Sequence, residues 1–273
     1  MAATEARRIN DREAPIMFGP VEPVFSVEER EIASGLRARI YRPVAREVLP
    51  VLLYFHGGGW VVGSLDSHDG VARFLANHAG SLVISVDYRL GPENRFPAAI
   101  EDAWASVMWA HEHAADDGGD ASRLAVGGDS SGGNLAAVVA RHARDRGIAI
   151  ALQLLVYPAL DCLLNDPDAE MEWWLSQYLR TDADALNPDA SPLRARDLRG
   201  VAPALILSCG LDPLRVQAEA YAERLREAGV AVEHVCFEGL IHTAYRMPGV
   251  LPGARDMLTA SADALLTAFE PTT

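Results

Sequence analysis

Lysine is absent from this chain of 273 residues, so all 24 basic residues are arginines. A phosphate-binding loop of the Walker type, a Schiff-base or pyridoxal site and the Ser-x-x-Lys mechanism all need a lysine amine. The sequence therefore excludes these sites, and a serine nucleophile in this chain has only histidine as its base. We expect no cofactor.

Cysteine is also scarce, with three scattered residues, Cys162, Cys209 and Cys236, and no C-x-x-C spacing. Such a set predicts small buried side chains in a reducing compartment. Long apolar runs are missing as well: no stretch approaches the roughly 20 residues of a membrane span, and Met1–Arg12 has no apolar signal core. We therefore expect a soluble, cytoplasmic protein without a membrane partner.

Positive charge is in deficit, because 38 acidic residues against 24 basic ones give a net charge of −14 and a pI near 4.9. Nucleic-acid binding needs clustered basic residues that displace counterions, so nucleic acid is not an expected partner. The segment His111-Glu112-His113 places its imidazoles at i and i+2, which do not share a helix face. We expect no metal site.

The most informative motif is Gly128-Asp129-Ser130-Ser131-Gly132-Gly133, which lies between an apolar run at 124–126 and a helix-like stretch at 134–140. A serine with glycine two positions away on either side, between a strand and a helix, fits a turn tight enough to expose its hydroxyl. The glycines remove side chains that such a reversal would crowd. The pattern predicts Ser130 as a nucleophile and the Ser131 amide as a donor to an oxyanion.

A second motif, His56-Gly57-Gly58-Gly59-Trp60, directly follows the apolar run 51–55. Three successive glycines are costly to order, which indicates that their backbone N–H groups closely approach a ligand oxygen such as that of an ester. In the α/β-hydrolase plan, a loop after an early strand supplies the other oxyanion donors. This motif therefore predicts the second half of an oxyanion hole.

Candidate acid and base residues follow the nucleophile, each just past a predicted strand. Asp212 comes after the buried run 204–208, and His242 comes after the run 232–237. Functional loops gather outside the carboxyl ends of the strands in an open α/β sheet. We therefore expect Ser130, Asp212 and His242 to lie on one rim as a catalytic triad.

Each of these assignments has alternatives. Asp212 before Pro213 also fits a helix N-cap with proline at the first helical position, and the two roles are compatible. Asp161 and Glu238 are other candidate acids. Asp161, however, precedes a different segment of the chain from the one that follows Asp212. Glu238 is too near His242 in sequence to reach its ring easily. Asp212 is the favoured acid.

Apolar runs and helix-like stretches alternate along the chain, which predicts an α/β fold with a mostly parallel sheet and helices on both faces. About eight strands are expected, at 24–32, 36–42, 51–55, 82–87, 124–127, 152–157, 204–209 and 232–238. Helices are expected near 67–79, 97–114, 131–146, 169–180, 213–228 and 254–269. The first two runs carry charges and are expected to pair antiparallel at an edge. One domain over residues 1–273 is sufficient.

Several blocks between Tyr41 and Tyr245 resemble the hormone-sensitive lipase family of α/β-hydrolases in its microbial esterase branch. These blocks are Tyr41-Arg42-Pro43, HGGGW at 56–60, the segments 87–93 and 96–102, GDSSGG at 128–133, Ser191-Pro192-Leu193, the segment 212–215 and Gly239 to His242. The resemblance implies the α/β-hydrolase fold, with Ser130 as nucleophile, His242 as base and Asp212 as orienting acid. It further implies an oxyanion hole made of the Gly58, Gly59 and Ser131 amides, and a possible homodimer.

The motifs and the resemblance together predict a serine carboxylic ester hydrolase. Its substrates are expected to be small-molecule esters with short- to medium-chain acyl groups, cleaved through an acyl-enzyme intermediate. An amidase or a lactone or carbamate hydrolase uses the same residues and stays open as an alternative. A non-catalytic, hydrolase-like receptor is disfavoured by the presence of His242.

Two regions that build the cap in this family are short here, namely the segment before the first strands and the stretch between Asp161 and Trp173. We therefore expect a reduced helical cap with elements from 1–22 and 162–190. Residues 1–22 are too charged to bury as a block and fit either a short helix or a loose tail. Asp166-Pro167 predicts a helix start. An amphipathic stripe with one buried face follows: Met171, Trp174, Leu175, Tyr178 and Leu179. Trp173 lies off this stripe, either facing solvent or lining a pocket mouth; we favour the pocket and expect Trp60 and Trp173 to contact the substrate.

Overall fold

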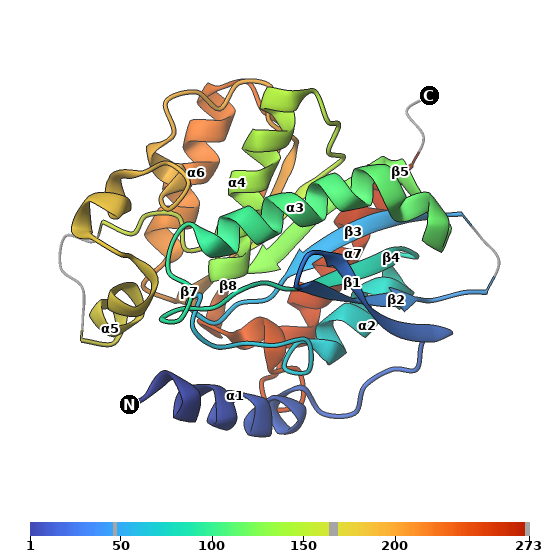
Figure 1. Cartoon of the computed structure of the whole chain (residues 1–273), viewed down its shortest axis with the longest axis horizontal. Coiled ribbons are helices and arrows are strands. Elements are labelled where there is room, and N and C mark those ends of the chain that lie inside the picture. Colours follow the sequence, from blue (N-terminus) through green and yellow to red (C-terminus); the bar gives the residue numbers. More distant parts are fainter. Residues whose placement is uncertain (46–47, 164–168, 271–273) are drawn as a thin grey trace.

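The centre of the structure is a sheet of eight strands in the order β1-β2-β4-β3-β5-β6-β7-β8 (Figure 1). The computed structural model describes residues 1–45, 48–163 and 169–270. The strands are β1 (Ser26–Ala33), β2 (Leu36–Arg42), β3 (Leu49–Phe55), β4 (Leu82–Asp87), β5 (Gly119–Asp129), β6 (Gln153–Val156), β7 (Ala204–Leu211) and β8 (Val232–Ile241). Strand β2 pairs antiparallel with β1 and β4, and all other neighbours are parallel. The predicted sheet and its charged antiparallel edge are confirmed.

Seven α-helices accompany the sheet in the described ranges. They are α1 (Ala3–Phe18), α2 (Asp69–His78), α3 (Ala98–His113), α4 (Ser131–Arg146), α5 (Ala169–Tyr178), α6 (Arg215–Glu227) and α7 (Ala254–Phe269). Short 3-10 helices occupy Ala114–Asp117, Asp182–Leu186, Pro192–Arg194 and Ala244–Arg246. The six helices expected from the sequence are confirmed, and the N-terminal segment forms a helix. The expected helix start at Asp166-Pro167 lies outside the described residues.

The sheet separates two hydrophobic clusters. All of β3 is buried, and its residues alternate between the faces: Val51, Leu53 and Phe55 join one cluster, whereas Leu52 and Tyr54 join the other. The first cluster includes residues of α3, α4 and α6, and the second includes residues of α2 and α7. This two-sided burial explains why the strand is a continuous apolar run, as expected for a parallel sheet covered on both faces.

Helices α1 and α5 lie beside the loop that follows β3. Ala6 of α1 forms a small apolar cluster with Val61 and Val62, against which Trp173 and Trp174 of α5 pack. Figure 1 shows both helices outside the layers of the sheet. The charged N-terminal segment is thus ordered by one narrow apolar face, with only Ala6 and Ala14 buried.

Polar contacts tether α1 to the body of the protein. Arg7 donates hydrogen bonds to the carbonyl oxygens of Val61 and Gly91, each at 2.7 Å. The Ser64 hydroxyl donates to Asp11 at 2.8 Å. These hydrogen bonds add to the narrow apolar face in holding α1 against the loop that follows β3.

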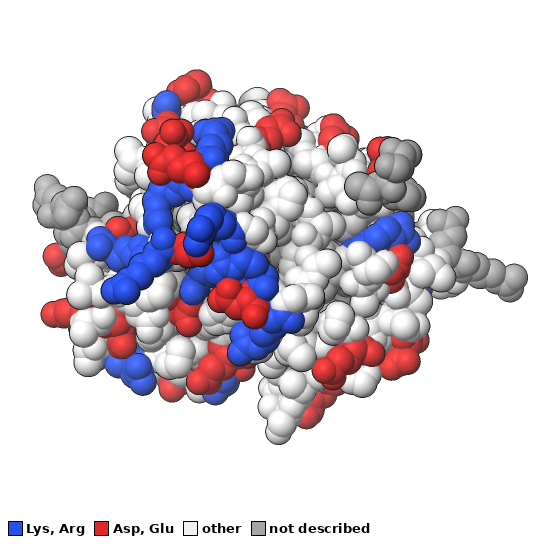
Figure 2. Space-filling view, turned by 90° about the horizontal axis from the view of Figure 1, so that it is seen from above, with Lys and Arg blue, Asp and Glu red and all other residues white. Residues whose placement is uncertain are grey.

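The surface carries charges of both signs. Figure 2 shows arginines gathered in one region of the face seen from above, with carboxylates among them. Within the described ranges, no helix is long and apolar enough to cross a membrane.

All three cysteines are free thiols, and Cys162 and Cys209 are buried as predicted. The prediction is wrong for Cys236, which is partly exposed because β8 is the last strand of the sheet and lacks a neighbour on one side.

Candidate active site

Ser130 occupies a strained turn between β5 and α4. Its backbone angles are φ 54° and ψ −116°, a conformation that non-glycine residues rarely adopt. The turn brings the following helix close to β3, and a Cβ atom on Gly132 would overlap the carbonyl oxygen of Phe55. A Cβ on Gly128 would overlap the same oxygen. The two glycines are therefore required by close backbone approach, as the motif predicts.

Three side chains from separate loops form one hydrogen-bonded chain. The Oγ atom of Ser130 lies 2.9 Å from Nε2 of His242, and Nδ1 of His242 lies 2.7 Å from Oδ2 of Asp212. The Asp212 side chain is fully buried, whereas the imidazole is 29% exposed. The structure thus brings the three predicted residues together, with the carboxylate shielded and the imidazole reachable from solvent.

The two oxygens of Asp212 have separate partners. Oδ1 accepts a hydrogen bond from the Leu214 amide at 2.8 Å, which leaves Oδ2 for the imidazole. The expected N-cap at Asp212 is wrong, because α6 begins at Arg215 and its N-cap is Leu214. Asp212 instead closes a short turn just before the helix. This turn fixes the carboxylate while it faces His242.

The other candidate acids have partners elsewhere. Asp161 pairs with Arg194 at 2.8 Å, and Glu238 pairs with Arg215 at 3.0 Å. Each of these carboxylates is therefore bound to an arginine instead of the His242 ring. The preference for Asp212 agrees with this geometry.

The glycine loop presents backbone amides beside the serine turn. Gly57 donates its N–H to Asp129 at 2.9 Å. Among the described residues, the amides of Gly58, Gly59 and Ser131 have no hydrogen-bond acceptor. The three amides expected to bind an oxyanion are thus available, whereas the amide of Gly57 already donates to Asp129.

The three tryptophans near the loop differ in position. Trp60 is only 3% exposed because its ring stacks on Tyr178 of α5, with ring centroids 4.1 Å apart. Trp173 packs edge to face on Trp174 at 4.7 Å. The Trp174 ring lies against Gly59, where a Cβ atom would come within 2.6 Å of its Cε3 atom. The Trp174 ring therefore packs against the loop that carries the candidate oxyanion amides, a contact that its place on the apolar stripe does not predict.

Tyr157 is a neighbour of the site that sequence reasoning missed. Its ring centroid lies 4.7 Å from that of His242, and its φ is 33°. Burial raises the pKa of this tyrosine well above its usual range. Because Tyr157 ends an almost uninterrupted apolar run, nothing in the sequence separates it from ordinary core residues.

A second serine–histidine pair lies away from the triad. Ser208 Oγ on β7 is 2.8 Å from Nε2 of His234 on β8. Ser208 is fully buried, and in the described ranges no carboxylate contacts the His234 ring. This pair lacks an exposed nucleophile and an orienting acid, so it serves as an internal comparison for the triad.

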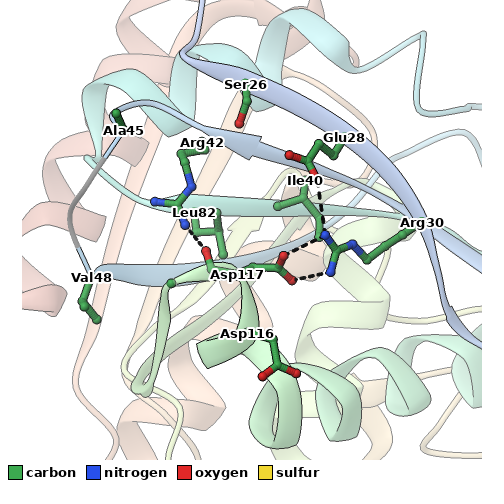
Figure 3. Close-up of a pocket in the computed structure, with 11 residues that line it drawn as sticks. Ser26, Glu28, Arg30, Ile40, Arg42, Ala45, Val48, Leu82, Asp116 and Asp117 are labelled. Atoms are coloured by element: carbon green, nitrogen blue, oxygen red, sulfur yellow. Dashed lines mark hydrogen bonds and ion pairs between the residues drawn. The ribbon is translucent and has the colours of Figure 1, made fainter.

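A polar cavity of about 550 Å³ opens near the start of β4, at the opposite end of the parallel strands from the triad (Figure 3). Arg30 crosses it to Asp117 at 2.8 Å, and Glu28 lies 3.3 Å from the same guanidinium. Burial raises the pKa of Asp117. The cavity contains no triad residue.

In the part of the chain that the structure describes, no cluster of three or more His, Cys, Asp or Glu side chains is placed to hold a metal ion.

A mostly parallel sheet, a strained serine between strand and helix, and a serine–imidazole–carboxylate chain together define an architecture of the α/β-hydrolase class. The family model described as alpha/beta hydrolase fold matches residues 52–246, and the chain belongs to this family.

Known relatives and solved structures agree with this membership. The chain is 46% identical over 231 residues to the carboxylic ester hydrolase LipN of Mycobacterium tuberculosis; the match covers 77% of this chain but 61% of that relative. It is 41% identical over 256 residues to the carboxylesterase NlhH of the same organism, with 86% and 80% of the two chains covered. A hyperthermophilic esterase from Pyrobaculum calidifontis superposes with a TM-score of 0.94 at 39% identity, covering 98% of this chain and 94% of the other.

Proposed function

We propose that this protein is a serine carboxylic ester hydrolase, a carboxylesterase, of the hormone-sensitive lipase branch of its family. The observation that carries the proposal is the continuous hydrogen-bonded chain from Ser130 through His242 to Asp212. The order of HGGGW and GDSSGG along the sequence supports the branch, and the esterase relatives support the reaction. The substrates are small-molecule esters.

The proposed reaction has two halves. In the first, His242 removes the Ser130 proton through Nε2 while Oγ attacks the ester carbonyl carbon, and Asp212 holds the ring through Nδ1 and stabilises its positive charge. The amides of Gly58, Gly59 and Ser131 receive the negative charge on the carbonyl oxygen. Collapse of this intermediate releases the alcohol with the proton from His242. In the second half, water activated by the same imidazole hydrolyses the acyl-enzyme.

We further propose that α1 and α5, which lie within segments 1–22 and 162–190, form a reduced cap over one domain. The position of the Trp174 ring against Gly59 supports acyl groups of short to medium length, because the ring occupies space beside the oxyanion amides. Trp173 contributes to this wall through its contact with Trp174. Trp60 would reach a substrate only if Tyr178 moved away from its ring.

Two wider expectations accompany the proposal. Three free thiols support a reducing, cytoplasmic setting. A homodimer stays a prediction, which light scattering of the purified protein can check.

The nucleophile is tested by comparing Ser130→Ala with Ser208→Ala, since both serines lie within 2.9 Å of an imidazole nitrogen. We expect Ser130→Ala to lose about a million-fold in kcat with p-nitrophenyl acetate, as in a hydrolase with the same three residue types. Ser208→Ala should keep turnover within a few-fold. A fluorophosphonate probe should label Ser130 alone, as mapped by mass spectrometry. Active Ser130→Ala protein would refute the assignment, and a panel of matched esters, amides, lactones and carbamates would identify a preference other than esters.

A further inference from the structure

We infer that Asp129 is a positioning residue that fixes the glycine loop at the distance at which its amides can receive the oxyanion. The inference rests on the proposed function and adds a residue that does not itself touch the substrate. Asp129 immediately precedes the nucleophile and is 2% exposed. A carboxylate buried beside the reacting serine requires a structural explanation, because an unsatisfied buried charge is strongly destabilising.

A single oxygen of Asp129 binds three separate segments. Oδ1 accepts hydrogen bonds from the Tyr54 hydroxyl at 2.8 Å and from the Gly57 amide at 2.9 Å. The same atom lies 3.1 Å from Nε2 of His68. Tyr54 belongs to β3, Gly57 begins the glycine loop, and His68 immediately precedes α2. The carboxylate thus joins the serine turn to both ends of the segment from Gly57 to His68.

Gly57 packs closely against the Asp129 carboxylate. A Cβ atom at this position would overlap Oδ2 of Asp129, so the loop backbone lies directly against the carboxylate. At the other end, the Ser67 hydroxyl lies 2.9 Å from Nδ1 of His68 and accepts from the Ser64 amide at 2.8 Å. The loop is therefore tied to the serine turn by a short, buried set of hydrogen bonds. Oxyanion stabilisation depends on donors being held in place before the reaction, which is the role this set supplies.

The charge of Asp129 strengthens these bonds. Burial alone would raise the pKa of this carboxyl, but the charge and hydrogen bond of His68, the Arg246 guanidinium and the Tyr54 hydroxyl together hold the pKa well below its usual range. A carboxylate is a stronger acceptor than a neutral oxygen, roughly doubling the strength of each bond. Neutralising Asp129 without changing its size should therefore loosen the Gly57 end of the loop.

The test uses Asp129→Asn and, as matched control, Asp102→Asn, which neutralises another largely buried carboxylate that binds Arg89 outside the site. We measure kcat and KM with p-nitrophenyl acetate, the inhibition constant of a trifluoromethyl ketone, and thermal unfolding. A trifluoromethyl ketone forms a hemiketal oxyanion on the serine and so reports on the loop amides. For Asp129→Asn we expect kcat to fall roughly tenfold with KM nearly unchanged, and the inhibitor to weaken by a similar factor.

A merely structural role predicts a different result. Folded Asp129→Asn protein with unchanged kcat and inhibitor affinity, or an equal loss in Asp102→Asn, would overturn the inference while the wild-type enzyme remains an esterase. Should Asp129→Asn not fold, His68→Leu removes the bond at the other end of the loop and should give the same parallel loss. A wild-type protein that neither hydrolyses esters nor reacts with a fluorophosphonate would refute the proposed function, and the inference with it.

Discussion

Acid should destabilise this protein through His56, the first residue of the glycine loop motif. The ring is fully buried, and its Nδ1 atom lies 2.9 Å from the carbonyl oxygen of Gly57. Among the described residues, its Nε2 atom has no hydrogen-bond partner. Protonation would therefore place a charge and a second N–H donor where no acceptor is available.

The magnitude follows from the pKa of this imidazole. Burial, with a smaller effect of neighbouring His68, lowers the pKa of His56 to about 3. In the unfolded chain the ring titrates near 6.5, so between these values the unfolded state binds one more proton than the folded state. The free energy of unfolding should then fall by about 1.4 kcal/mol for each pH unit below 6.5. Burial also lowers the pKa of His68, which adds a loss of the same sign.

Urea unfolding at half-unit steps from pH 7.5 to pH 5 measures this slope directly. His56→Asn keeps a side-chain donor near the Gly57 carbonyl but cannot take up a proton. Its free energy of unfolding should therefore fall less steeply with pH, by about 1.4 kcal/mol per pH unit. His111→Asn is the control, because the His111 side chain is exposed on α3 and should not change the slope. A free energy of unfolding that stays constant between pH 6.5 and pH 5 would refute the reasoning.

Further predictions concern the walls of the site. Trp174→Ala should raise the rate ratio of octanoate to acetate p-nitrophenyl esters by about fifteen-fold if two more methylene groups find room, at roughly 0.8 kcal/mol each. If Trp173→Ala changes this rate ratio more than Trp174→Ala does, then Trp174 is not the side chain that limits acyl length beside Gly59. Tyr157→Phe should leave the unfolding free energy in urea unchanged or higher, because the buried hydroxyl has no partner within the described ranges. Tyr157→Leu should lower kcat by removing the ring beside His242, and equal activity would argue against that contact.

Most of the fold could be predicted because strand and helix periods are local properties. The run 51–55 could be recognised as a strand of a sheet with helices on both faces, and charges in the first two runs indicated the antiparallel edge. The meeting of Ser130, Asp212 and His242 could also be predicted, since each follows a strand whose carboxyl end lies on the same rim. Their catalytic roles and those of the loop amides stay predictions.

What could not be predicted depends on contacts between distant segments. Trp60 is buried by Tyr178, a partner 118 positions later, and no local pattern reports that stacking. The stripe on α5 indicated a buried face without indicating that Trp174 would lie against Gly59. The start of α6 at Arg215 was missed because the Asp212 side chain binds the Leu214 amide in a turn, which uses the same residue types as a cap.

One of the contacts that tether α1 to the body of the protein is sensitive to ionic strength. Arg7 also forms an ion pair with Glu93 at 2.6 Å, and the glutamate side chain is half exposed. Dissolved salt screens such a contact, whereas the apolar clusters on the two faces of the sheet are not weakened in this way. Rising salt should therefore weaken this one tether of the N-terminal helix, while the hydrogen bonds of Arg7 to the Val61 and Gly91 carbonyls persist.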